Sequence, residues 1–91
     1  MSAPRSKPEV LQTLIDMITD VLGEDLGVEA GTSFRDELGF QSIQFVALAE
    51  LVQERYDDVD FVSWLSEKEI SEILALRVGN VTDFIVASAA A

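Results

Sequence analysis

Apolar residues recur at helical spacing in three separate stretches, and this pattern constrains the fold more than any other feature of the sequence. The first stripe comprises Val10, Leu11, Leu14, Ile15, Ile18, Val21 and Leu22. Ser6 and Glu9 before it have the spacing of a capping box, and Gly23 after it is a natural stop. The spacing therefore predicts a helix over residues 8–22.

Two further stripes predict two more long helices. A helix over residues 42–56 would turn Phe45, Leu48, Ala49, Val52 and Tyr56 toward the core, and Val78, Val81, Phe84 and Ile85 mark a last helix at about residues 79–88. Between them, Ser66 and Glu69 form a second capping-box pattern, which predicts a short helix through about Leu74. The apolar run over 61–65 has no clear assignment. No segment alternates as a strand does, so we expect an all-α four-helix bundle with three longer helices and a short third helix.

A long first loop is expected over residues 23–41, because glycines and acids interrupt the helical pattern there. The apolar residues Leu26, Val28, Phe34 and Leu38 would hold this loop against the helices. We predict one domain over residues 8–88, preceded by a flexible tail at 1–7 and followed by a frayed end at 89–91. Long loops in compact domains are often functional, which directs attention to the end of this one.

Charge and composition exclude several classes of function. The chain has 17 acidic and 6 basic side chains, for a net charge of −11. Such a surface repels phosphate backbones and anionic membranes, so we expect no nucleic acid or membrane partner, and a basic protein surface instead. With neither cysteine nor histidine, the chain lacks the usual thiol and imidazole of catalytic and metal sites. We expect no enzyme activity and no metal, and a cytoplasmic protein, because no apolar run resembles a signal peptide or a membrane helix.

Ser42 is the strongest candidate for chemistry. It lies where a glycine-containing loop meets the predicted second helix, and a helix N-terminus favours an attached phosphate through its free N–H groups and partial positive charge. The alternative is that Ser42 is simply an N-cap residue, a position for which serine is among the preferred types. Spacing alone favours the cap.

A docking patch is predicted beside Ser42. Ile43 and Val46 fall near the face of the second helix opposite the core stripe, where Ala47 and Glu50 also lie. Apolar side chains exposed at one end of a helix are typical of a protein contact.

Residues 34–56 resemble the signature of acyl and peptidyl carrier proteins, in which a Leu-Gly-x-[Asp/His]-Ser-[Leu/Ile] motif opens the second helix. The corresponding run here is Leu38-Gly39-Phe40-Gln41-Ser42-Ile43. The resemblance implies that Ser42 is esterified with 4′-phosphopantetheine, taken from coenzyme A. It also implies a four-helix bundle with a long first loop, no catalytic activity, and a monomer. The implied partners are a phosphopantetheinyl transferase, an acyl- or aminoacyl-loading enzyme, and downstream biosynthetic enzymes.

Departures from the motif suggest which kind of carrier this is. Gln41 replaces the usual Asp or His, and Gln44 and Ala47 stand where fatty-acid carriers often have acids. The resemblance therefore favours a free-standing carrier of specialised metabolism, polyketide or nonribosomal peptide, whose partners bind Gln41, Ile43, Val46, Ala47 and Glu50. The alternative is an acidic helical adaptor that binds a partner through the Ile43–Ala47 face and is never modified.

Overall fold

Five helices make up the computed structural model, which describes residues 6–89. They are α1 (Lys7–Leu22), α2 (Ser42–Arg55), α3 (Phe61–Ser66), α4 (Ile70–Leu74) and α5 (Val78–Ala89). Within the described residues the only bridge of strand type is an isolated pairing of Ser33 with Arg77. The predicted all-α bundle is confirmed, with one more helix than expected. Residues 1–5 of the flexible tail predicted at 1–7, and residues 90–91 of the frayed end predicted at 89–91, lie outside the described residues.

The first helix begins one residue earlier than predicted, and its ends are those that the sequence indicates. The Glu9 N–H donates to Ser6 Oγ at 3.3 Å, so Ser6 caps a helix that starts at Lys7. Gly23 ends the helix, and its N–H donates to the Thr19 carbonyl at 2.8 Å.

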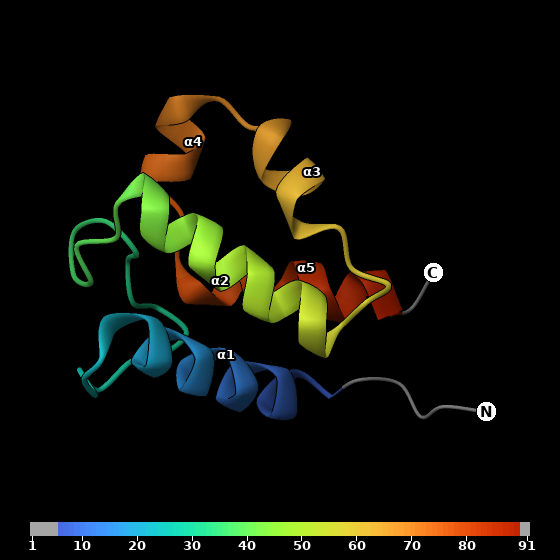
Figure 1. Ribbon diagram of the computed structural model, residues 1–91, viewed down its shortest axis with the longest axis horizontal. Coiled ribbons are helices and arrows are strands. Elements are labelled where there is room, and N and C mark those ends of the chain that lie inside the picture. The colour runs from blue at the N-terminus through green and yellow to red at the C-terminus, as the bar shows by residue number, and fades with distance from the viewer. Residues whose placement is uncertain (1–5, 90–91) are drawn as a thin grey trace.

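The core lies between α1, α2 and α5, with α1 packed against both of the others (Figure 1). Its fully buried aliphatic side chains include Leu14, Ile18, Leu48, Val52, Val81 and Ile85. These are the inward-facing positions of the three predicted stripes, and each such side chain contributes about 1.5–3 kcal/mol by leaving water. The two short helices, α3 and α4, lie above this three-helix body in Figure 1.

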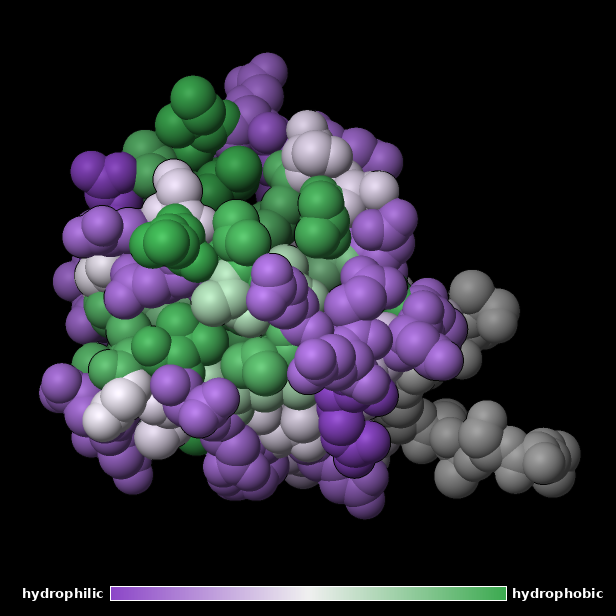
Figure 2. Space-filling view, viewed as in Figure 1, coloured by the Kyte–Doolittle hydropathy of each residue, from purple (hydrophilic) through white to green (hydrophobic). Residues whose placement is uncertain are grey.

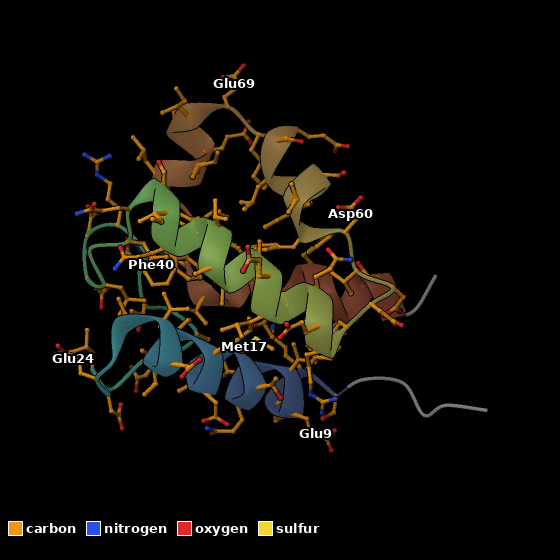
Figure 3. The ribbon with its side chains drawn as sticks, viewed as in Figure 1. Glu9, Met17, Glu24, Phe40, Asp60 and Glu69 are labelled. Atoms are coloured by element: carbon orange, nitrogen blue, oxygen red, sulfur yellow. The ribbon has the colours of Figure 1, made fainter. Side chains whose placement is uncertain are left out.

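The segment between α2 and α5 differs from the sequence prediction, because two short helices replace the one expected from Ser66. The apolar run that had no assignment forms α3, and Asp60 caps it by accepting the Ser63 N–H at 3.1 Å and the Ser63 hydroxyl at 2.7 Å. Ser66 ends α3 and donates to the Ser63 carbonyl, so the predicted capping box of Ser66 with Glu69 is wrong. Glu69 is instead the N-cap residue of α4, which begins at Ile70 (Figure 3).

Aromatic stacking holds α3 against α5. Phe61 is fully buried, and the ring of Trp64 lies 4.5 Å from that of Phe84 with only 10° between their planes. This contact holds α3 in position, and α3 forms one surface of the molecule together with α2 and α4.

Backbone hydrogen bonds join the long first loop to the segment that leads into α5. The Phe34 N–H donates to the Leu76 carbonyl at 3.2 Å, and the Val78 and Gly79 N–H groups donate to Thr32 and Ala30 at 3.0 and 2.7 Å. A Cβ on Gly79 would lie 3.0 Å from the Ala30 carbonyl oxygen, so this close approach needs glycine.

The predicted apolar contacts of the loop are mostly confirmed. Val28, Phe34 and Leu38 are buried, whereas Leu26 is 45% exposed, so the prediction that Leu26 holds the loop in place is wrong.

Candidate functional site

Ser42 is the first residue of α2, and its side chain is exposed. The N-cap position belongs to Gln41, whose backbone is extended and whose N–H donates to Gln44 Oε1 at 2.6 Å. Ser42 therefore is not the N-cap residue, contrary to the structural alternative that spacing alone favoured. No described residue forms a hydrogen bond with its hydroxyl, which leaves the Oγ atom open to chemistry.

The backbone around Ser42 suits a negatively charged substituent. The Gln44 and Phe45 N–H groups both donate to the Gln41 carbonyl, at 2.9 and 3.1 Å. The N–H groups of Ser42 and Ile43 have no backbone acceptor within the described chain, as expected in the first turn of a helix. A singly charged phosphodiester at this end of α2 would gain about 0.3–1 kcal/mol from the helix dipole.

Three phenylalanine rings position the residues on either side of Ser42. Phe34 and Phe40 come from the loop and Phe45 from α2, and their ring centroids are 5.1–5.4 Å apart. Figure 3 shows Phe40 beside the start of α2, on the side that faces α1. Gly39 lies between two of these rings in sequence and has a φ of +65°, a left-handed conformation that favours glycine. The ring contacts and the backbone conformation of Gly39 together determine the position of Ser42 at the end of the loop.

Two hollows adjoin one another beside this serine. The first, of about 590 Å³, is lined by Arg35, Gly39, Gln41 and Ser42 on one side and by Ile70 and Leu74 of α4 on the other. The second, of about 510 Å³, lies between α2, α3 and α4 and has mostly apolar walls, among them Val46, Ala49, Val62 and Leu65. Phe45 and Ile73 line both hollows. Figure 2 shows the hydrophobic residues that gather over these three helices.

The residues predicted to bind partners surround the same serine. Gln41, Ile43, Val46 and Glu50 are exposed, with Ile43 at 76% and Val46 at 58%, while Ala47 is half-buried. This places the five residues on an accessible surface, and whether they bind a partner stays a prediction.

Three further exposed apolar residues near this surface were not predicted from the sequence. Val62 of α3 and Ile70 and Leu74 of α4 are 57%, 76% and 40% exposed. Their exposure could be inferred from the sequence only by seeing that they lie outside every core stripe. That inference requires the bounds of the two short helices, which the sequence does not give. Val46 and Val62 line the second hollow, Ile70 and Leu74 line the first, and Ile43 lines neither.

The described residues contain no group of three or more side chains suited to hold a metal ion. Likewise, none of the helices in the described part of the chain has the length and apolarity needed to cross a membrane.

Comparison with protein families assigns a role to this arrangement. The family model described as a phosphopantetheine attachment site matches residues 12–76, well over half of the chain. The matched region begins within α1, contains the first loop and Ser42, and ends just before α5. No curated protein and no solved structure matches the chain.

Proposed function

The chain belongs to the phosphopantetheine attachment-site family, and on that premise we propose that it is a carrier modified at Ser42. Family membership makes 4′-phosphopantetheine its prosthetic group and makes the chain a carrier rather than an enzyme. The position of Ser42 supports this choice of serine. It lies within the matched region, is exposed as the first residue of α2, and is beside two N–H groups that have no backbone acceptor.

The residues at the start of α2 are suited to hold 4′-phosphopantetheine. In the cytoplasm, a transferase would move phosphopantetheine from coenzyme A to the Ser42 Oγ atom. A bond from Oγ to phosphorus forms as the pyrophosphate P–O bond of coenzyme A breaks, adenosine 3′,5′-bisphosphate leaves, and a base of the transferase takes the hydroxyl proton. The first turn of α2 would stabilise the negative charge of the resulting phosphodiester. When bound, the prosthetic group supplies the thiol for thioester chemistry, which a chain without cysteine lacks. The loop, held in place by the three phenylalanines, keeps Ser42 at the edge of the first hollow. The phosphate end of the phosphopantetheine chain, which we call the base of the arm, therefore has a defined position.

The cargo that we propose is an apolar acyl group from specialised metabolism, polyketide or nonribosomal peptide. The second hollow supports an apolar group, because its walls are largely aliphatic and aromatic side chains next to those that surround Ser42. The polar side chains that line this hollow are Glu50, Gln53 and Ser66. The neutral Gln41 and Gln44 near the attachment serine support a carrier distinct from the fatty-acid type.

Partner enzymes would approach the surface around Ser42. We propose that the phosphopantetheinyl transferase, the loading enzyme and the downstream enzymes contact Gln41, Ile43, Val46, Ala47 and Glu50, with the carrier acting as a monomer. The net charge of −11 supports partners with basic surfaces, whose association rates would fall as salt is added.

Intact-protein mass spectrometry tests the proposal. The parent chain, Ser42→Ala and Ser71→Ala are each incubated with coenzyme A, Mg²⁺ and a broad-specificity phosphopantetheinyl transferase. Ser71 is a suitable control because it is also exposed, in α4. We expect the mass of one phosphopantetheine to be added to the parent and to Ser71→Ala, and not to Ser42→Ala.

Two other outcomes would contradict the proposal. Addition of the group to Ser42→Ala would show that another residue is modified. No addition to a folded parent chain would favour the second candidate, an unmodified adaptor that binds through the exposed Ile43 and Val46 side chains.

A further inference from the structure

Most basic side chains in the described part of the chain already have a partner. Lys7 pairs with Asp83 at 2.8 Å, and Arg77 donates to the Gly31 carbonyl and lies 4.0 Å from Glu37. The Arg55 guanidinium lies over the Tyr56 ring, and the Lys68 ammonium lies over the Trp64 ring. Arg35 is the exception among the described residues, because it forms no ion pair, no side-chain hydrogen bond and no ring contact.

The backbone of Arg35 is held firmly although its side chain is exposed. The preceding Phe34 is completely buried, and the Phe40 N–H donates to the Phe34 carbonyl at 2.8 Å. The Gly39 N–H donates to the Arg35 carbonyl itself at 3.1 Å. These contacts fix the base of the Arg35 side chain, which lines the same hollow as Ser42.

Nearby acids do not neutralise Arg35. Glu37 accepts the Ser33 N–H at 3.3 Å and faces Arg77, so its carboxylate is already engaged. Asp36 is adjacent in sequence but forms no ion pair within the described residues. Gln41, which lines the same hollow as Arg35 and Ser42, is uncharged. In a chain with a net charge of −11, an arginine without an acidic partner beside the modified serine needs an explanation.

We propose that Arg35 binds the phosphodiester of the arm attached to Ser42; the inference rests on the function proposed above. A guanidinium offers a planar pair of N–H donors that matches two phosphate oxygens, and a bond between ionised groups is stronger than a neutral one. A phosphate on Ser42 would lie beside the first turn of α2, at the hollow that Arg35 of the loop also lines.

The consequence is a defined direction for the arm. A phosphate held between the start of α2 and Arg35 places the base of the arm inside the first hollow, against Ile70 and Leu74 of α4. An arm whose base is fixed in this way loses fewer conformations when its far end enters a partner enzyme. Arg35 is therefore a positioning residue for the prosthetic group.

The test compares the phosphopantetheine-bearing and unmodified forms of four chains: the parent, Arg35→Gln, Arg35→Lys and Arg55→Gln. Arg55 is the matched control because it is an exposed arginine at the opposite end of α2. One measurement is the ³¹P chemical shift of the phosphodiester as salt is added. The other is the difference in thermal midpoint between the modified and unmodified forms of each chain.

We expect the ³¹P signal of the parent and of Arg55→Gln to move as salt weakens the pairing, and that of Arg35→Gln to be displaced at low salt and insensitive to salt. The modified-minus-unmodified midpoint should fall by about 2–5 °C in Arg35→Gln relative to the parent. Arg35→Lys should lie between them, because it keeps the charge without the planar donors.

The inference is overturned if Arg35→Gln and Arg55→Gln give the same ³¹P shift, the same salt dependence and the same midpoint difference as the parent. That result leaves the carrier function standing, because the group is still attached in all four chains. Failure of the parent to accept the group at all overturns the carrier function and the role of Arg35 together, so the two failures are distinguishable.

Discussion

Replacing Phe34 with alanine should remove a large part of the stability of the domain. The Phe34 side chain is fully buried, and its ring lies 5.1 Å from that of Phe40 and 5.4 Å from that of Phe45. Phenylalanine-to-alanine changes in protein cores cost about 3–5 kcal/mol. Two ring contacts, each contributing about 0.5–1.5 kcal/mol, place this site toward the upper end of that range. A domain of this size has roughly 5–15 kcal/mol in total, so the loss is a substantial fraction.

Urea unfolding, followed by helical circular dichroism and by Trp64 fluorescence, measures the effect. With a slope of about 1–1.5 kcal/mol per molar urea for a small domain, a loss of about 4 kcal/mol lowers the midpoint by about 3–4 M. Leu26→Ala in the same loop is the control, and it should cost under about 1 kcal/mol because Leu26 is 45% exposed.

The reasoning is refuted if Phe34→Ala loses no more stability than Leu26→Ala. Such a result would mean that the ring cluster does not anchor the end of the loop, and the defined position of Ser42 would lose its physical basis.

Three further predictions concern the backbone and the helix caps. Gly39→Ala should lower the free energy of unfolding by roughly 1–2 kcal/mol and slow modification of Ser42, because alanine is strained at a φ of +65°; equal stability and an equal rate of phosphopantetheine transfer would contradict this. Gly79→Ala should lower the thermal midpoint by several degrees, because its Cβ would meet the Ala30 carbonyl at 3.0 Å, whereas Gly31→Ala, with open space around it, should leave the midpoint nearly unchanged. Asp60→Ala should lower the midpoint at neutral pH through loss of the α3 cap. The Ser63 hydroxyl and N–H depress the pKa of Asp60 in the folded chain, so this stabilisation is present above about pH 4 and is lost as pH falls through the lower folded value. The parent and variant midpoints should therefore converge in acid, and a difference that stays constant from pH 7 to pH 2 would refute the cap.

The long helices could be predicted from the sequence because their apolar stripes extend over several turns. In α1 the stripe, the Ser6 cap and the Gly23 stop agree, so its bounds were predicted to within one residue. The short helices could not be predicted in the same way. A helix of five or six residues contains too few turns for a periodic stripe, and the choice between Asp60 and Ser66 as a cap depends on tertiary packing.

The motif predicts Ser42 as the attachment residue, and its modification stays a prediction. The position of Ser42 as the first helical residue rather than the cap could not be predicted, because it depends on the hydrogen bond between Gln41 and Gln44. It was also not predictable that Arg35 and Ser42 line the same hollow. The position of Arg35 depends on the conformation of the loop, and that conformation depends on contacts with residues about forty positions later, such as the hydrogen bond from the Phe34 N–H to the Leu76 carbonyl.

Those contacts between the first loop and the segment before α5 also determine when the site can exist. Because synthesis proceeds from the N-terminus, α1, the loop and α2 are made before Leu76 and Val78. Until those residues arrive, the loop lacks the partners for its hydrogen bonds at Phe34 and Thr32. A transferase that recognises the folded loop would therefore act on Ser42 only after residues 76–79 have been made and have packed against the loop.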